Sequence, residues 1–176
     1  MPKPSRNHTR TLARWTTVAL AAVIIGAIPQ SARGGEEQAV ADASARFYAA
    51  LNAMFTGEVA PMTQVWSHRD DVTYMGPDGG FEVGWEQVRA VWDKQAAKKL
   101  GGRVEPSETR TTLGGDLAVV STVEVGENTN ADGKTARVSI RATNVFRKED
   151  GSWKMIGHHT DLLPFLAEPQ QVGAAR

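Results

Sequence analysis

The sequence contains no cysteine in its 176 residues. This absence excludes disulfide frameworks, zinc sites built on thiolates, cysteine nucleophiles and lipid attachment through cysteine. Aromatic residues are also few, at 7%, and charged residues make up 23% of the chain, a composition typical neither of a disordered chain nor of a membrane bundle. The length fits one small domain with spare chain at its ends, and it leaves no room for two ordinary domains.

An excess of positive charge is missing as well, because the chain has 20 basic and 20 acidic side chains. Residues 1–34 hold five of the basic residues and no acidic one, so the remainder has 15 basic against 20 acidic side chains, a net charge of −5. A nucleic-acid partner requires a clustered basic face. We therefore expect no nucleic acid among the partners of this protein.

One uncharged apolar run stands near the start of the chain, from Trp15 to Ile28. It follows the basic segment Lys3–Arg14 and precedes Pro29 and small residues, which is the order of a secretory signal peptide. As a helix it would cover only about 21 Å, less than the roughly 30 Å of a hydrocarbon core, so no stable membrane span is expected. We predict a signal peptide at 1–34, a domain at 35–166, a flexible tail at 167–176, and a secreted or periplasmic location. The alternative is an uncleaved membrane anchor.

The first half of the mature chain carries helical spacing interrupted by a glycine-rich turn. Apolar residues at Val40, Phe47, Leu51 and Met54 share one helix face. A proline can open a second, shorter helix because it fits the first helical position. The expected elements, in chain order, are a helix at 36–56, a short helix at 61–65, short strands at 72–75 and 81–83 around the turn 76–80, and a third helix from 85 to about 100.

The second half reads as four strands at 103–113, 117–127, 134–148 and 152–162, joined by short turns. Short turns require antiparallel neighbours, so helices followed by a strongly bent antiparallel sheet give the fold class α+β. Alternation in each strand places one face inward. The residues expected to face inward are Leu117, Val119, Ser121, Val123 and Val125; Val138, Ile140, Ala142, Asn144 and Phe146; and Trp153, Met155, Gly157, His159 and Asp161.

Three segments carry a resemblance to a known family: RFYAALN at 46–52, DDVTYMGPDGGFEVGWEQV at 70–88 and FRKEDGSWKMIGHHTD at 146–161. Together with the order of elements, they make roughly residues 38–163 similar to the SnoaL-like branch of the nuclear transport factor 2-like superfamily. The resemblance implies a cone-shaped, strongly bent antiparallel sheet covered by about three N-terminal helices. It names no reaction, because the superfamily includes isomerases, cyclases, dehydratases and proteins that only bind or dimerise.

The chemical groups of the steroid-isomerase members do not carry over to this sequence. By this resemblance, their oxyanion tyrosine falls at Phe47, their aspartate base at Gly76 and their second oxyanion acid near Asn144. A phenyl ring cannot donate a hydrogen bond and a glycine cannot take a proton. Tyr48 lies one residue along the helix, and we expect it to be partly exposed rather than a replacement donor.

The last strand supplies the candidate catalytic residues, His159 and Asp161, which alternation places on one face. A carboxylate beside an imidazole raises its basicity and fixes its tautomer, as a general base requires. The alternative is a hydrogen-bonded polar pair at the pocket floor or in a dimer face. His68 with His159 and Asp161 has the composition of a metal site, but nothing in the spacing enforces one, so we expect neither a metal nor another cofactor.

The candidate ligand-binding residues are Trp66, His68, Tyr74, Trp92 and Asn144, although aromatic residues at helical spacing, Trp92 included, are more often simply core. We predict an exported domain that binds a small hydrophobic or aromatic molecule in a cone pocket. The first alternative is a proton-transfer or hydration enzyme of the isomerase, dehydratase or cyclase type that uses His159 and Asp161. The second is an association module, with a homodimer formed through the outer sheet face that carries Arg141 and Arg147.

Overall fold

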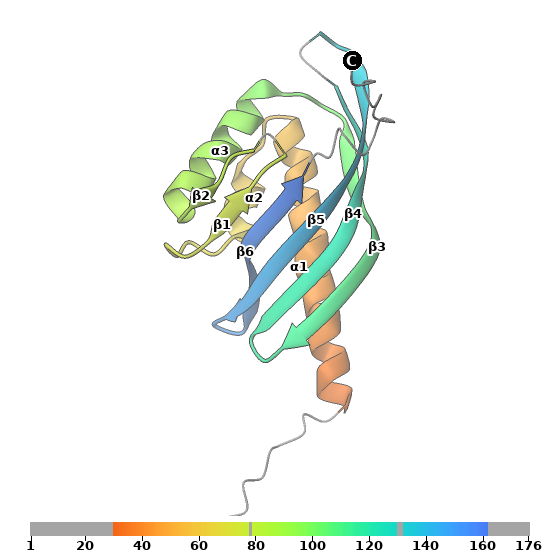
Figure 1. The fold of residues 1–176 in the computed structure, drawn as a ribbon. Helices are drawn as coiled ribbons and strands as arrows, with labels where there is room; N and C mark the ends of the chain where they lie inside the picture. The colour runs from red at the N-terminus through yellow and green to blue at the C-terminus, as the bar shows by residue number, and fades with distance from the viewer. Residues whose placement is uncertain (1–29, 78, 130–131, 162–176) are drawn as a thin grey trace, which may run out of the picture.

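The computed structural model describes residues 30–77, 79–129 and 132–161 (Figure 1). The observed elements are α1 (Gln30–Phe55), α2 (Ala60–Val65), β1 (Thr73–Met75), β2 (Glu82–Val83), α3 (Trp85–Lys98), β3 (Arg103–Gly114), β4 (Leu117–Thr129), β5 (Thr135–Glu149) and β6 (Ser152–Asp161). The order of helices and strands is the one that the sequence predicts, with α1 beginning six residues earlier than expected. The apolar run at 15–28 and the tail at 167–176 lie outside the described residues. Within the described ranges, no helix is both long and apolar enough to span a membrane.

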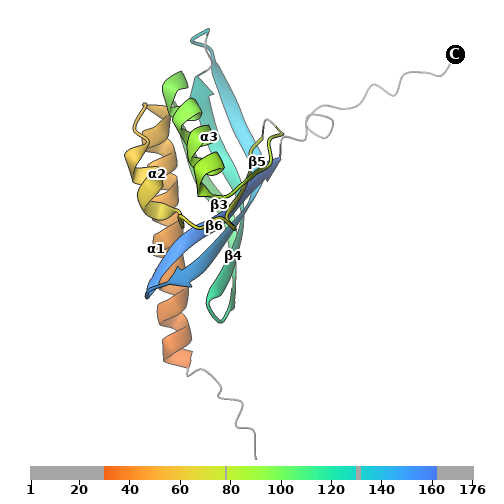
Figure 2. The ribbon, with the colours of Figure 1, turned by 90° about the vertical axis from the view of Figure 1, so that its left-hand side faces the viewer.

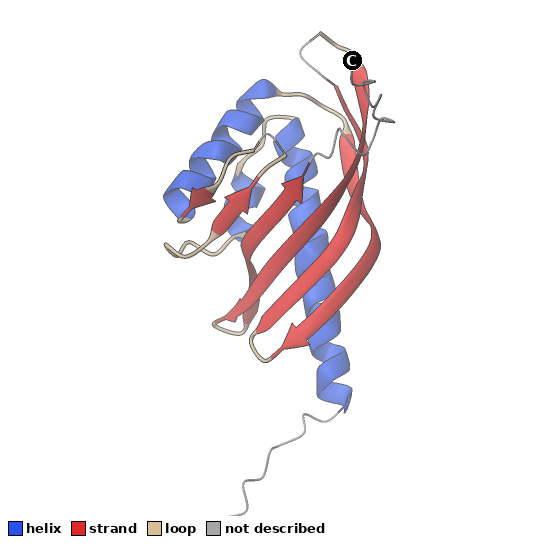
Figure 3. Cartoon of the chain, viewed as in Figure 1, coloured by secondary structure: helices blue, strands red, loops and turns tan. Residues whose placement is uncertain are grey.

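Six strands form one curved sheet in the order β2-β1-β6-β5-β4-β3. Each of the four long strands is antiparallel to the next one along the chain, whereas β1 pairs with β6 in parallel. The three helices lie on the concave side of this sheet (Figures 2 and 3). The architecture is therefore the predicted α+β cone, a bent sheet covered by N-terminal helices, to which the structure adds one parallel pair of strands.

The core lies between α1 and the concave face of the sheet. Val40, Phe47 and Met54 recur on one side of α1 and are at most 2% exposed, as a helix with one apolar face requires. Phe146 and Met155 meet them from the sheet and are equally buried. This packing holds α1 along the sheet and fixes the position of every α1 side chain that reaches the interior.

The N-terminal part of α1 is attached to the β5–β6 hairpin by Glu36. Lys148 donates from Nζ to Glu36 Oε1 at 2.5 Å, and Trp153 donates from Nε1 to Glu36 Oε2 at 3.0 Å. These donors hold the pKa of the Glu36 carboxyl below its ordinary value because they stabilise its charged form. The early turns of α1 are therefore tied to the sheet by polar contacts as well as by packing.

Helix α3 starts at a glycine that no other residue replaces without strain. Gly84 has a φ of 87°, and a Cβ at this position would lie 3.3 Å from the Asp70 carbonyl oxygen, so both the dihedral angle and the close approach favour glycine. The turn is closed by Trp85, whose backbone N–H donates to the Arg69 carbonyl at 3.1 Å. The helix then directs Trp92, two turns later, toward the interior of the cone.

Candidate functional site

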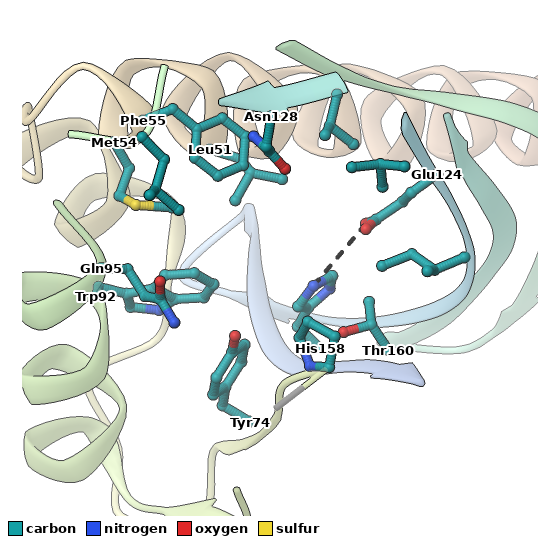
Figure 4. Close-up of a pocket in the computed structure, with 15 residues that line it drawn as sticks. Leu51, Met54, Phe55, Tyr74, Trp92, Gln95, Glu124, Asn128, His158 and Thr160 are labelled. Carbon is teal, nitrogen blue, oxygen red and sulfur yellow. Dashed lines mark ion pairs between the residues drawn. The ribbon is translucent and has the colours of Figure 1, made fainter. Parts of the chain in front are cut away.

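A cavity of about 170 Å³ lies between α1, α3 and the concave face of the sheet (Figure 4). We call it the cone cavity. It is lined by Leu51, Met54, Phe55, Tyr74, Pro77, Trp92, Gln95, Leu100, Val104, Glu124, Asn128, Val138, Ile140, His158 and Thr160. Most of these side chains are apolar, and the polar ones come mainly from the strands β4 and β6. This combination is typical of a site for a small, mostly apolar molecule that is oriented by a few polar groups.

A β-bulge in β6 decides which histidine enters the cavity. Val145 pairs with Gly157 and Phe146 pairs with Met155, so Ile156 has no partner on β5. One extra residue exchanges the two faces of the strand beyond it. His158 and Thr160 consequently line the cavity, while the neighbouring His159 faces outward.

The prediction that His159 and Asp161 face the cavity is therefore wrong. Their side chains are 43% and 61% exposed, on the outer face of the sheet. The expected pair does form there, with His159 Nε2 at 2.9 Å from Asp161 Oδ2. Regular alternation from Trp153 onward does not include the bulge at Ile156, so it predicts the wrong face for every residue after it.

The inward face of β4 is also the opposite of the predicted one. Val120 pairs with Asn144, and Glu124 pairs with Ile140, and directly paired residues on neighbouring strands share a face. Because Asn144 faces inward, so do Val120 and Glu124, and Glu124 is 3% exposed. Leu117, Val119 and Val125 lie on the outer face instead, with 47%, 37% and 38% of their surface exposed.

Four polar residues form a hydrogen-bond chain behind and beside the cavity. Tyr48 donates its hydroxyl hydrogen to Glu124 Oε1 at 3.0 Å, and Asn144 Nδ2 donates to the Tyr48 oxygen at 3.0 Å. His158 Nδ1 lies 2.6 Å from Asn144 Oδ1. Because an amide oxygen only accepts, His158 must carry its hydrogen on Nδ1. The other ring nitrogen, Nε2, is then left as an acceptor on the side of the cavity.

Burial sets the protonation states of the titratable residues in this hydrogen-bond chain. It raises the pKa of Glu124 to about 7, partly opposed by the hydrogen bond from Tyr48, and it lowers the pKa of His158 to about 3, with a further contribution from the neighbouring His159. Burial and the nearby Glu124 also raise the pKa of the Tyr48 hydroxyl above its usual range. Near neutral pH, His158 and Tyr48 are thus neutral, and Glu124 exists in both its protonated and ionised forms.

Tyr48 corrects a second expectation, because it is 4% exposed rather than partly exposed. Phe47 packs beside it, with the two ring centroids 5.1 Å apart, and also contacts His158 at 4.8 Å. Residues one apart on a helix point about 100° from each other, but α1 lies closely enough along the sheet that both side chains are buried. Tyr48 is therefore a buried donor, and its hydroxyl hydrogen is taken by Glu124.

The predicted ligand-binding residues divide into three groups. Tyr74 and Trp92 line the cavity, with ring centroids 4.6 Å apart. Asn144 and Trp66 are buried and do not line the cavity. Asn144 lies behind it, and Trp66 packs in the core with its ring centroid 6.1 Å from that of Trp92. His68 is exposed on the surface.

His68 makes its contacts near α2 and the start of α3. Its ring stacks on Trp85 at 4.5 Å, and its Nε2 donates to the Thr63 carbonyl oxygen at 2.8 Å. No group of three histidine, aspartate or glutamate residues that could hold a metal ion occurs in the parts of the chain that the structure describes.

Sequence reasoning missed Tyr48, Glu124, His158 and Thr160 as site residues. A signal was present for Glu124: it is the only carboxylate in the run from Leu117 to Val125, whose other residues are alanine, valine, serine, threonine and leucine. An acidic residue in the middle of such a strand is ordinarily exposed, and one that is buried is a candidate site residue. The strand register with β5 would have decided between the two, because Asn144 was already expected to face inward.

The sequence model of a family described as the SnoaL-like domain matches residues 40–162. Many solved structures share the fold. A suspected dehydratase of the NTF2-like family from Streptomyces avermitilis has 22% identity and a TM-score of 0.65, with 73% of this chain and 96% of that chain covered. An NTF2-like superfamily protein from Salmonella enterica has 15% identity and a TM-score of 0.67, covering 82% and 99%.

A suspected calcium/calmodulin-dependent protein kinase type II association domain from Thiobacillus denitrificans has 28% identity and a TM-score of 0.59, covering 69% of this chain and 92% of its own. No curated protein is similar enough to this chain to count as a match. The comparisons thus agree on the architecture, while the proteins that share it are described by different activities.

Proposed function

The chain belongs to the SnoaL-like domain family, and we propose that it is exported and binds a small, mostly apolar molecule in the cone cavity. The observation that carries this proposal is the cavity itself, about 170 Å³ with walls of leucine, methionine, valine and aromatic residues. An apolar cavity of roughly 150 Å³ is large enough for benzene. The ligand is therefore the size of one substituted ring or a short branched chain.

Ligand binding can be tested by changing only the volume of the cavity. Val138 lines it from β5, so Val138→Phe should fill it and Val138→Ala should enlarge it. We expect single-ring compounds to raise the melting temperature of the wild type and of Val138→Ala, but not of Val138→Phe. Equal responses of all three proteins would show that these compounds bind elsewhere.

A second candidate function, proton transfer, is favoured by the position of Glu124. Its carboxyl lines the cavity, and burial brings its pKa to about 7, where a carboxylate acts efficiently as a general base near neutral pH. Glu124 would remove a proton from a bound carbon acid, and Tyr48 would hold its carboxylate in place. The suspected dehydratase among the structural neighbours is consistent with such chemistry. In this proposal Glu124 takes the role that the sequence suggested for His159.

Proton transfer can be measured without knowing the natural substrate. Glu124 should catalyse exchange of the α-hydrogens of a small cyclic ketone with deuterium from solvent, followed by NMR. Glu124→Gln should abolish the catalysed exchange, whereas Glu127→Gln, on the exposed face of the same strand, should retain it. If Glu124→Gln exchanged the hydrogens as fast as the wild type, or if the wild type were no faster than buffer alone, this candidate would be eliminated.

We also propose that two copies associate through the outer face of the sheet. Leu117, Val119 and Val125 expose apolar surface there on one strand, and such surface favours a protein partner when it is contiguous. Arg147 on the same sheet is already engaged, because its guanidinium pairs with Asp71 and Glu149 at 2.6 and 2.8 Å. The suspected association domain from Thiobacillus denitrificans is consistent with an assembly role.

A further inference from the structure

Two buried hydrogen-bond acceptors face each other at the edge of the cone cavity. Glu124 Oε1 lies 3.9 Å from His158 Nε2, and both side chains are 4% exposed (Figure 4). Nε2 is an acceptor because Nδ1 holds the ring hydrogen that it donates to Asn144. The separation is too long for a direct hydrogen bond. No hydrogen bond from the described part of the chain reaches Nε2, so this acceptor is left for a group that enters the cavity.

The surroundings of this acceptor pair favour a positive charge. Among the described residues, the lining of the cavity includes Glu124 and no lysine or arginine. The groups that face Glu124 are Tyr48 from α1 and His158 from β6, and neither carries a positive charge near neutral pH. When Glu124 ionises, none of the described residues of the site supplies a cationic partner, and a buried charge without a partner is unfavourable.

Aromatic rings complete the walls beside the pair. Tyr74 stacks on the His158 ring at 5.8 Å with an interplanar angle of 15°, and Trp92 lies 6.3 Å from it. Aromatic faces attract cations. Thr160, which also lines the cavity, has a buried hydroxyl oxygen that makes no hydrogen bond with the described part of the chain, and it lies next to His158 (Figure 4).

We propose that the cone cavity selects a small primary or secondary amine in its ammonium form, with two N–H groups bridging Glu124 and His158 Nε2. A nitrogen about 2.8 Å from both acceptors would see them at an angle of roughly 90°, which an ammonium group can satisfy. The hydrocarbon part of the ligand then fills the apolar end of the cavity beside Leu51 and Met54. This inference rests on the proposed binding function and names the class of ligand. The proposal excludes carboxylate ligands, because their negative charge would lie beside that of Glu124 without a compensating cation.

Three ligands of nearly equal size separate the possibilities in a calorimetric titration of the whole protein: benzylamine, benzyl alcohol and benzoate. At about pH 8 the amine is protonated and Glu124 is mostly ionised. We expect benzylamine to bind roughly tenfold or more tightly than benzyl alcohol, since hydrogen bonds between charged groups are the stronger ones, and benzoate not to bind. At about pH 5.5, where Glu124 is protonated, benzylamine should lose roughly tenfold in affinity while benzyl alcohol changes little.

Glu124→Gln should remove the preference for the amine and keep the binding of benzyl alcohol, and Glu127→Gln should behave as the wild type. Benzyl alcohol binding as tightly as benzylamine in the wild type at about pH 8 would overturn the amine proposal and leave the binding function standing. Absence of binding by all three compounds would instead count against the binding function itself. The comparison of ligands and of pH in the wild type decides the matter even if Glu124→Gln fails to fold.

Discussion

Replacing Glu124 by glutamine should stabilise the protein in alkaline solution, although the side chain is buried and hydrogen-bonded. Burial raises the pKa of Glu124 from 4.5 to about 7 in the folded state. Between these two values the folded state holds a proton that the unfolded state has released, so the free energy of unfolding falls as the pH rises. The loss begins near pH 4.5 and is complete just above pH 7. With about 1.4 kcal/mol for each pH unit, ionised Glu124 costs about 3 kcal/mol of stability.

Glutamine keeps an oxygen that can accept from Tyr48 and carries no charge to desolvate. The difference in unfolding free energy between Glu124→Gln and the wild type should therefore increase by about 3 kcal/mol from about pH 4.5 to about pH 8. Taking the difference cancels the other titrating groups, of which His158 is the most important. Its lowered pKa, about 3, makes the folded state lose stability as the pH falls below its unfolded value of 6.5, and this slope opposes that of Glu124 between pH 4.5 and 6.5.

The assay is urea denaturation of both proteins at several pH values, with Glu127→Gln as the control for loss of one exposed carboxylate. In thermal scans the same effect should appear as a rise of roughly 10 °C for Glu124→Gln at high pH. A difference that stays constant across this range would mean that Glu124 titrates like an exposed glutamate. The reasoning from its burial would then be refuted, and with it the basis for a general base or an ammonium partner at this position.

The remaining predictions concern other parts of the molecule. Tyr48→Phe removes the hydrogen bond to Glu124 and leaves a buried acceptor, which should lower the unfolding free energy by about 2 kcal/mol and raise the pKa of Glu124 further, as followed by denaturation and by NMR titration. Val119→Lys on the outer face should convert a dimer into monomers in sedimentation equilibrium without changing the melting temperature of the monomer, and an unchanged mass would place the interface elsewhere. Gly126→Ala should lower the unfolding free energy by roughly 2–4 kcal/mol, because the new methyl group would collide with the Arg103 carbonyl oxygen and force β3 away from β4. Removing residues 1–34 should keep the protein inside the cell that makes it, as measured by fractionation, and export of the shortened chain would contradict the signal-peptide prediction.

Much of the architecture could be predicted because it depends on short-range patterns. The helical spacing of Val40, Phe47 and Leu51, the glycine-rich turns and the four alternating strands each specify one element, and the short turns between strands require antiparallel pairing. The alternation of β5 is also correct throughout, since no bulge interrupts that strand. Asn144 is accordingly buried, as expected.

The site could be predicted only in part, because it depends on strand faces rather than on strand existence. Alternation gives two equal choices of face, and β4 carries more valine on the side that proves to be exposed, so hydrophobicity alone selects the wrong one. In β6 a bulge exchanges the faces at a residue that has no turn signal. The prediction that Tyr48 is partly exposed fails for a related reason, because the burial of a residue at the side of an amphipathic helix depends on how closely the sheet curves around that helix.

The unpaired residue at Ile156 makes the chemistry of the cavity depend on the length of a strand as well as on its side chains. If β6 paired regularly beyond Met155, with every residue kept and no bulge, His159 and Asp161 would turn to the inward face and His158 to the outer one. Among proteins with this fold, residues aligned in sequence need not place their side chains at equivalent positions in the interior. Transferring a catalytic role from one member to another therefore requires that every bulge between the compared positions be counted first.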